Sequence, residues 1–396
     1  MLNGQLVELS RRGHTITVAT RSTNTDQLTS HSDDKFKVVF YNAPDGMGLK
    51  SLTQTLIRVR NLVDSLIESS SPDLIYIQQP LSGAGALLSR AARRLPAAYM
   101  FCSPWSDEYR VRLPQAANFP LAPDAIPLNR GETLKLMLRK HIEGTVMNHT
   151  QRKFIMSDFM LQRCIALHQF NNGQFTMVPG GVDTNRFYPP PDRAALRSSI
   201  GFDADQQILL TVRNLHPRMG IGNLISAMPG ILALHPDTLL IIGGTGVLGP
   251  SLRDQVRTLG IEPSVRFAGF IPEEELPKYY GAADLFVLPT AALEGFGMVT
   301  VEAMACGTPV IGTPVGATPE LLRRLDPSLV LAGLDSQSIQ QGCIDFLNRG
   351  KGQRNELRSK CRSHALELYS WESVTNIIEN TLQSLLRVPG SSPSAA

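Results

Sequence analysis

Short apolar runs alternate with longer amphipathic segments along most of the chain. In the first half, the apolar runs predict these strands: 16–20, 37–41, 73–77, 97–101, 153–157 and 175–179. Helix-period patterns between them predict these helices: 49–69, 82–95, 131–147 and 158–168. Strands that alternate with helices in this way form parallel sheets covered by helices.

The second half repeats this alternation after a polar, proline-rich stretch. Its apolar runs predict these strands: 208–212, 239–243, 265–269, 285–289, 309–312 and 329–332. We interpret 180–206 as a linker that carries a short helix. The chain is therefore expected to be α/β, with two Rossmann-like, doubly wound domains at 1–180 and 181–368 that face a cleft. The composition of 388–396 is typical of a disordered tail.

Composition and charge narrow the class of protein. Hydrophobic residues make up 42% of the 396 residues, which provides enough apolar surface for two cores. The 38 basic and 35 acidic residues nearly balance, so we expect no nucleic-acid partner. The slight basic excess leaves peripheral contact with an anionic membrane open.

The cysteines and the apolar runs indicate the cellular compartment in which the protein is expected. Cysteines are odd in number and lack metal-ligand spacing: Cys102, Cys164, Cys306, Cys343 and Cys361. No apolar run is long enough to span a bilayer, and the N-terminus does not resemble a signal peptide. We expect a cytoplasmic protein, and peripheral association with the inner membrane face stays open.

The densest chemical signal is the segment 293–320. Its first acid is Glu294 and its second is Glu302, with seven residues between them. The residues from Gly295 to Gly297 form a glycine-rich turn, and a helix is expected to begin near Met298. A helix N-terminus presents N–H groups to an anion, and the two carboxylates would accept hydrogen bonds from hydroxyls. A phosphate-bearing, hydroxyl-rich ligand needs this combination.

A second signal follows the strand 208–212. Arg213 and Arg218 lie in the loop before the next helical pattern. Two guanidinium groups at the carboxyl end of a strand suit a diphosphate group.

The segment 293–320 resembles the donor-site signature of family 4 glycosyltransferases, E-x-F-G followed by E-A-M-A-x-G-x-P-V. These transferases have the two-domain GT-B fold. The resemblance implies that Glu294 contacts the donor sugar and that Glu302 binds the ribose. It also implies a turn that contains Phe296 and binds the diphosphate. The amides of this turn belong to Gly297, Met298 and Val299.

The arginine loop departs from the family's G-R-L-x-x-x-K-G string. Arg213 matches, but Asn214 is inserted before Leu215, so the Lys position holds either Arg218 or Met219. We assign it to Arg218, which would bind the diphosphate with Arg213.

Weaker matches extend the resemblance over most of the chain. PGGVDTNRF resembles the domain-crossover loop, with Gly180 and Gly181 in the cleft. The segment 267–290 resembles the part whose backbone contacts the base, from Gly269 to Ile271. SWESV resembles the start of the terminal helix, which implies that 369–387 crosses back to the first domain.

Two departures bear on activity. Cys102 occupies the position of a family histidine that lies close to the donor sugar. The chain also opens in a helical pattern and lacks the family's first strand, so strands 16–20 and 73–77 are expected to face a gap. Such a gap is costly because it leaves backbone groups unpaired. We therefore hypothesise that the natural chain starts upstream of Met1; the alternative is a decayed gene.

The resemblance therefore implies a retaining, metal-independent glycosyltransferase. The expected donor is a UDP- or GDP-sugar. The expected acceptor is a hydroxyl of a glycan, lipid-linked or small-molecule substrate in polysaccharide, glycolipid or cell-envelope glycan synthesis. The alternative is a degenerate paralogue or partner subunit that binds a nucleotide sugar with weak or no catalysis.

Overall fold

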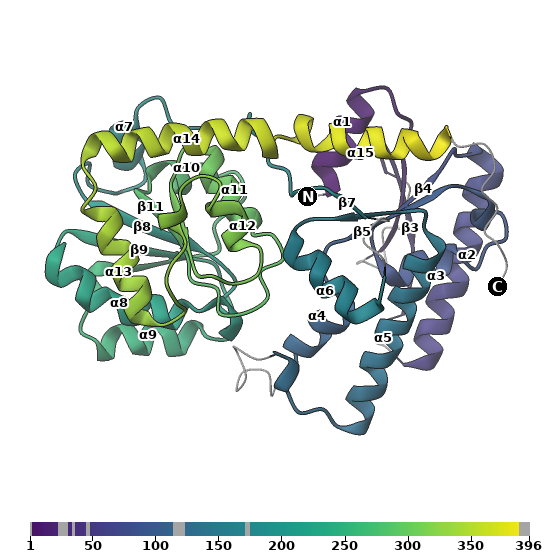
Figure 1. Cartoon of the computed structure of the whole chain (residues 1–396), viewed down its shortest axis with the longest axis horizontal. Helices are drawn as coiled ribbons and strands as arrows, with labels where there is room; N and C mark the ends of the chain where they lie inside the picture. The colour runs from purple at the N-terminus through teal and green to yellow at the C-terminus, as the bar shows by residue number, and fades with distance from the viewer. Residues whose placement is uncertain are drawn as a thin grey trace. The chain divides into compact units, whose positions relative to one another are not determined.

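A computed structural model describes residues 2–22, 31–33, 36–44, 48–113, 123–170 and 175–387. The chain forms two compact units, and each is described separately (Figure 1). The N-terminal unit comprises Met1–Arg112, Pro127–Pro179 and Val374–Ala396. The C-terminal unit comprises Leu113–Ile126 and Gly180–Ser373. The predicted domain limits stay a prediction, and the predicted tail at 388–396 lies outside the described residues.

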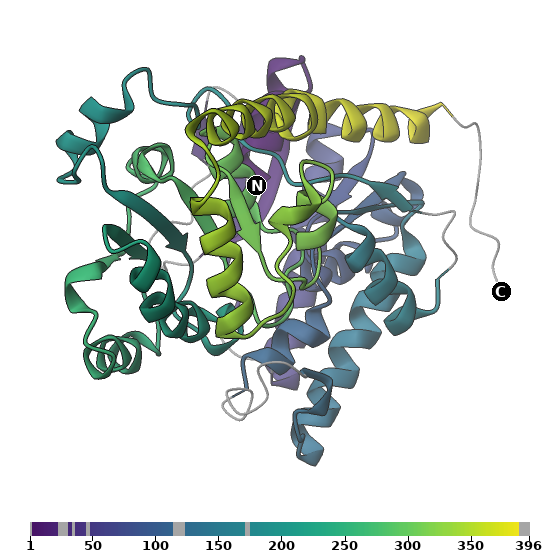
Figure 2. The ribbon, with the colours of Figure 1, turned by 60° about the vertical axis from the view of Figure 1, so that its left-hand side comes forward.

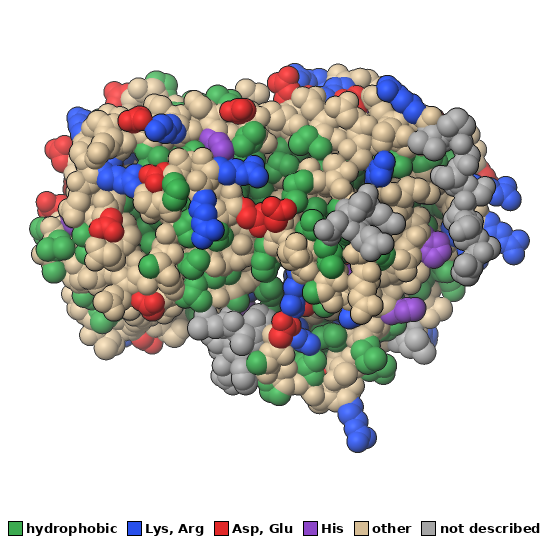
Figure 3. All heavy atoms as spheres, in the orientation of Figure 1, with side chains coloured by type: hydrophobic (Ala, Val, Ile, Leu, Met, Phe, Trp, Pro, Cys, Tyr) green, Lys and Arg blue, Asp and Glu red, His purple; other side chains and the backbone are tan. Residues whose placement is uncertain are grey.

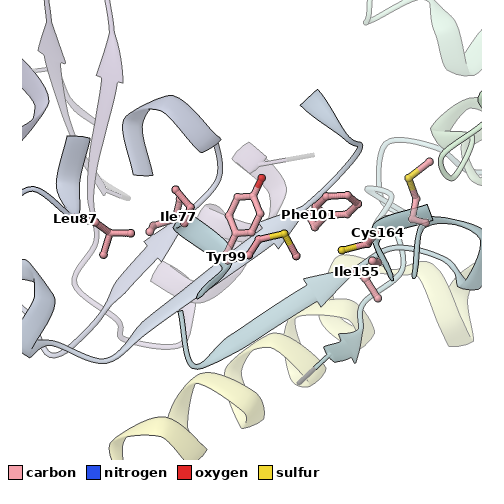
Figure 4. Packing of buried hydrophobic residues seen from close by; sticks show 9 residues of the cluster. Ile77, Leu87, Tyr99, Phe101, Ile155 and Cys164 are labelled. Carbon is pink, nitrogen blue, oxygen red and sulfur yellow. The ribbon is translucent and has the colours of Figure 1, made fainter. Parts of the chain in front are cut away.

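A four-stranded parallel sheet forms the centre of the N-terminal unit, in the order β4-β5-β6-β7. Its strands are β4 (Ile75–Ile77), β5 (Ala97–Phe101), β6 (Arg152–Ile155) and β7 (Phe175–Met177). Figure 4 shows the apolar cluster around this sheet, where Ile77, Tyr99, Phe101 and Ile155 pack with Leu87 and Cys164. Burial of these side chains holds the helices against the sheet.

A second sheet of the N-terminal unit has the order β1-β3-β2. β1 (Thr17–Arg21) is parallel to β3 (Phe36–Tyr41), and β2 (His31–Asp33), which was not predicted, is antiparallel to β3. Among the described residues, no strand joins β1 to β4. These are the two strands that were expected to face a gap.

The helices of the N-terminal unit are α1 (Leu2–Arg11), α2 (Leu49–Ser70), α3 (Pro80–Ala86), α4 (Trp105–Val111), α5 (Arg130–His149), α6 (Asp158–His168) and most of α15 (Trp371–Leu386). The prediction of one helix over 82–95 was wrong, because α3 ends at Ala86 and only a short 3-10 turn, η1 (Ala92–Arg94), follows. Gly83 and Gly85 in α3 weaken helix propensity, and their lack of a side chain permits close approach to Ile77 and Val59.

A five-stranded parallel sheet forms the centre of the C-terminal unit. Its order, β10-β9-β8-β11-β12, is the doubly wound order 3-2-1-4-5. The strands are β8 (Gln207–Val212), β9 (Thr238–Gly243), β10 (Val265–Gly269), β11 (Leu285–Leu288) and β12 (Val310–Gly312). The side chains of β8, β9, β11 and β12 are nearly all buried, as a sheet covered on both faces requires. In the edge strand β10, only Val265 is buried.

Two groups of helices cover this sheet (Figure 1). α8 (Ile221–Leu234) packs against α9 (Gly249–Thr258) and α13 (Ser336–Leu347), and Figure 2 shows the same layer from another side. The other group contains α7 (Arg193–Ser199), α10 (Leu276–Ala282), α11 (Met298–Ala305) and α14 (Lys351–Tyr369). A further short helix, α12 (Thr318–Leu322), follows β12.

The predicted strand at 329–332 was wrong. The segment begins in a 3-10 turn, η7 (Pro327–Leu329), and only Val330 forms a bridge, to Gly312. The side chain of Asp326 accepts a hydrogen bond from the Ser328 amide and stabilises the turn. The local polar cap therefore outweighs the short apolar run.

The linker helix α7 is fixed to the sheet by a partly buried ionic cluster. The Asp284 carboxylate, just before β11, accepts hydrogen bonds from Arg193 and Arg197, each at 2.7 Å, and from the amide of Ile208 at 2.8 Å. Burial alone would raise the pKa of Asp284, but the two guanidinium groups and the amide hold it below its ordinary value. Burial also lowers the pKa of Arg193, which offsets part of the stabilisation.

The surface agrees with the nearly balanced charge of the sequence. On the face drawn in Figure 3, acidic and basic side chains are interspersed over both units. Within the described part of the chain, no helix is both long and apolar enough to cross a membrane.

Candidate functional site

The loop before α11 has a backbone that few residue types adopt. Leu293 has φ +56° and Gly297, at the N-cap of α11, has φ +85°. Gly316 lies against this loop: a Cβ there would meet the Glu294 carbonyl oxygen at 2.0 Å. The amide of Ala317 donates to the same oxygen at 2.9 Å. Gly316 and Ala317, which follow β12, therefore hold the backbone of this loop in place.

The side chain of Glu294 forms a buried ion pair with Arg213 at the end of β8. Arg213 Nη2 lies 2.6 Å from Glu294 Oε2, and the hydroxyl of Thr290 donates to the same oxygen at 2.8 Å. All three side chains are buried. The residues predicted for the sugar and for the diphosphate therefore belong to one network. Thr290 was not predicted, since only the fold brings its hydroxyl to Glu294.

Arg218 and Met219, the two candidates for the Lys position, lie in the short 3-10 helix η5 (Pro217–Met219) and make different contacts. Met219 is buried, and its sulfur lies 2.9 Å from Arg213 Nη2. Arg218 is half-buried and donates to the carbonyl of Leu293 at 3.1 Å. Met219 is therefore the neighbour of Arg213, while Arg218 contacts the loop before α11. Diphosphate binding by Arg218 stays a prediction.

The start of α11 offers N–H groups that a helix leaves without internal partners. Met298 and Val299 are its first residues, and no side chain caps Gly297. Thr300, one residue further on, is fully buried, and its Oγ1 has no hydrogen-bond partner among the described residues. A buried, unpaired hydroxyl in the first turn is a group that a ligand could satisfy. Thr300 was not predicted as a site residue.

Glu302 lies one turn inside α11 and is half-buried. The hydroxyl of Tyr280 in α10 donates to Glu302 Oε2 at 2.9 Å. Burial raises the pKa of Glu302, and the Tyr280 hydroxyl partly opposes this change. Burial and the nearby carboxylate raise the pKa of Tyr280 well above its ordinary value, so Tyr280 acts as a hydrogen-bond donor.

The two glycines of the predicted crossover loop have different neighbours. A Cβ on Gly180 would meet Met298 Sδ at 2.5 Å and the ring of Phe296 at 2.6 Å. A Cβ on Gly181 would instead meet the ring of Trp371 at 2.3 Å. Both glycines were predicted to lie in the cleft. Of the two, Gly180 lies beside the turn before α11. Gly181 permits close packing at the start of α15.

The predicted base-binding segment lies at the end of β10. Gly269 has φ +69°, and its carbonyl accepts a hydrogen bond from the amide of Gly244 at 2.6 Å. Ile271 is buried against Gly243, whereas the intervening Phe270 is 73% exposed. The backbone here is therefore held by the glycine-rich turn after β9. Base binding stays a prediction.

Cys102 belongs to the N-terminal unit, whereas the other predicted site residues belong to the C-terminal unit. It is half-buried, directly after β5, and burial raises the pKa of its thiol to about 12. The next turn is fixed by Glu143 of α5, whose carboxylate accepts hydrogen bonds from the Trp105 amide and the Tyr99 hydroxyl, each at 3.3 Å. The thiol therefore stays protonated near neutral pH and is a weak donor.

Comparison with models of protein families shows the family of this chain. The model for "Glycosyltransferase Family 4" matches residues 5–186, and that for "Glycosyl transferases group 1" matches residues 192–367. The chain belongs to the family 4 glycosyltransferases, as the motifs at 293–320 indicated.

Individual relatives match only part of their length. The chain is 33% identical over 218 residues to the GDP-mannose-dependent monoacylated alpha-(1-6)-phosphatidylinositol monomannoside mannosyltransferase of Corynebacterium glutamicum, over 53% of this chain and 56% of the relative. It is 37% identical over 177 residues to the GDP-mannose-dependent alpha-(1-6)-phosphatidylinositol monomannoside mannosyltransferase of Mycolicibacterium smegmatis, over 43% of this chain and 46% of the relative. The chain thus spans about half the length of these curated relatives.

The comparison with solved structures confirms the GT-B fold. Sucrose-phosphate synthase from Thermosynechococcus elongatus matches with a TM-score of 0.78 and 22% identity. The match covers 97% of this chain and 92% of that one. The predicted α/β fold with two Rossmann-like domains is therefore confirmed.

Proposed function

We propose that this chain is a retaining glycosyltransferase that moves a sugar from a nucleoside diphosphate donor to an acceptor hydroxyl. One observation carries the proposal: the Arg213–Glu294 pair lies at the loop that leads into α11, the helix that holds Glu302. A nucleotide sugar needs positive charge and N–H groups for its diphosphate, and carboxylates for its hydroxyls.

The chemistry of the departing diphosphate assigns the roles. Negative charge grows on the diphosphate as its bond to the anomeric carbon breaks. In this proposal, Arg213, Arg218 and the first amides of α11 stabilise that charge. Glu294 accepts a hydrogen bond from a sugar hydroxyl, and Glu302 accepts one from the ribose. These groups supply the positive charge, so the proposal includes no metal ion, and EDTA should leave the rate unchanged.

We propose GDP-mannose as the first donor to test, because both mannosyltransferase relatives are named for it. A UDP-linked hexose is the second. The same two names contain a phosphatidylinositol mannoside, which supports a lipid-linked glycan as the acceptor. An enzyme with that acceptor would work at the cytoplasmic face of a membrane as a peripheral protein.

The test is a transfer assay on the purified chain. GDP-mannose and UDP-glucose, each with a labelled sugar, are incubated with the protein and a bacterial lipid extract. We expect one donor to release its nucleoside diphosphate and to label the lipid fraction. NMR of the product should show retention at the anomeric carbon. Nucleotide binding without turnover of any donor would favour the degenerate alternative, and absence of binding would refute the site.

A further inference from the structure

Tyr280 is a buried side chain that touches Glu302 and is fixed on several sides. Its ring packs against Phe187 and Phe286, with centroids 6.0 and 5.5 Å away. Its carbonyl accepts a hydrogen bond from the Thr308 hydroxyl at 2.6 Å. The ring is fully buried. A side chain held in this way offers its hydroxyl in one place.

We propose that Tyr280 is a positioning residue that binds Oε2 of Glu302 and so presents Oε1 to the donor ribose. The inference rests on the proposed function, because it takes the ribose as the ligand of Glu302. Oε1 has no hydrogen bond to the described residues, and the side chain is half-buried rather than enclosed. A carboxylate that is already fixed loses less conformational entropy when it binds a ligand than a mobile carboxylate does.

The charge state of Glu302 gives the inference a second readout. Its carboxylate is influenced by burial, by Tyr280, by Arg186 and by Glu273. The Cys306 thiol also faces it. Burial and Glu273 raise the pKa of Glu302, whereas Tyr280 and Arg186 lower it. Removal of the Tyr280 hydroxyl therefore moves that pKa upward, and ribose binding by the ionised carboxylate should fail at a higher pH.

The test uses Tyr280→Phe, which keeps the ring and removes only the hydroxyl. Titration calorimetry compares GDP and UDP with their 2′,3′-dideoxy forms. We expect the variant to bind the natural nucleotide roughly tenfold more weakly and the dideoxy form as the wild type does. The pH at which affinity is half lost should rise. Tyr279→Phe is the matched control, because Tyr279 packs on Phe202 and its hydroxyl has no hydrogen bond to the described residues.

Glu302→Gln separates this inference from the proposed function. If Glu302→Gln weakens nucleotide binding and Tyr280→Phe does not, the positioning role is wrong and the ribose assignment stands. If neither Glu302→Gln nor loss of the ribose hydroxyls changes affinity, the ribose assignment is wrong and the inference fails with it. The double variant should bind as Glu302→Gln alone does, because both changes act through one carboxylate. Additive losses would overturn the inference.

Thermal unfolding shows whether Tyr280→Phe folds. If it does not, a second variant tests the inference. Tyr280→3-fluorotyrosine keeps the hydroxyl and makes it a stronger donor. The pH at which nucleotide affinity is half lost should then move downward. An unchanged midpoint would overturn the inference.

Discussion

Arg213 Nη2 and Glu294 Oε2 lie 2.6 Å apart in a buried ion pair, although they are 81 positions apart in the sequence. Arg213 directly follows β8, and Glu294 lies in the loop that leads to α11. One partner is proposed to bind the diphosphate and the other the transferred sugar. The pair therefore links the two parts of the donor whose bond breaks.

Glu294→Gln should reduce turnover more than nucleotide affinity. The amide keeps the size of the side chain but removes the charge that accepts from Arg213 and Thr290. Loss of one charged hydrogen bond costs about 1.5–3 kcal/mol, so kcat should fall roughly ten- to hundredfold. Steady-state kinetics with saturating donor measures this. Glu356→Gln, which removes one member of an exposed pair with Lys360, should behave as wild type. A loss of affinity equal to the loss of kcat would contradict the sugar assignment.

Arg218→Ala and Met219→Lys together decide which residue serves the diphosphate. If Arg218 binds it, Arg218→Ala should lower the transfer rate more than nucleoside binding, since charge grows there as the bond breaks. Full activity of Arg218→Ala would instead favour the register with Met219 at the Lys position. In that register Met219→Lys should raise the rate, provided the cation fits beside Arg213, 2.9 Å from the present sulfur. Pre-steady-state release of the nucleoside diphosphate separates chemistry from binding.

Cys102→His should raise the transfer rate of an active preparation. The protonated thiol is a weak donor, whereas an imidazole N–H is a stronger one. The surrounding turn stays fixed by the Trp105–Glu143 hydrogen bond, so the new ring has a defined support. The measurement is kcat with saturating donor, compared with Cys343→Ser at a buried cysteine of the other unit. No gain would show that position 102 does not approach the sugar.

Asp284→Asn should destabilise the C-terminal unit by roughly 2–4 kcal/mol, because it removes the charge that pairs with two guanidinium groups, of which that of Arg197 is buried. The pKa of Asp284 is lowered in the folded state, so its contribution is present above its ordinary pKa and is lost as the pH falls through the folded value. Chemical unfolding at several pH values measures this. The difference between variant and wild type should shrink below about pH 4. Asp254→Asn, in an exposed pair with Arg257, should change stability by less than about 1 kcal/mol.

The part of the site that local sequence encodes could be predicted. The turn at Gly297 and the start of α11 at Met298 depend on neighbouring residues and match the expectation. The roles of Glu294 and Glu302 stay a prediction. Most predicted strands also lie within one or two residues of those observed, because buried parallel strands are continuous apolar runs.

The remaining features depend on contacts between distant segments. Thr290 and Tyr280 reach the two glutamates only after β11 and α10 pack beside α11. The neighbour of Arg213 could not be settled from sequence, because the insertion at Asn214 left two registers open. The prediction of a strand at 329–332 was wrong, because so short an apolar run does not show whether the segment lies beside a sheet edge with which it can pair.

We propose that the start of α11, with Glu302 and with Glu294 in the loop before it, holds a nucleoside diphosphate sugar. A crystal structure of the chain with GDP-mannose, or with UDP-glucose if that donor binds, tests it most directly. We expect the diphosphate at the amides of Met298 and Val299, the ribose at Glu302 and the sugar at Glu294. A nucleotide bound elsewhere on the chain, with Glu302 and the α11 amides not in contact with it, would refute this assignment.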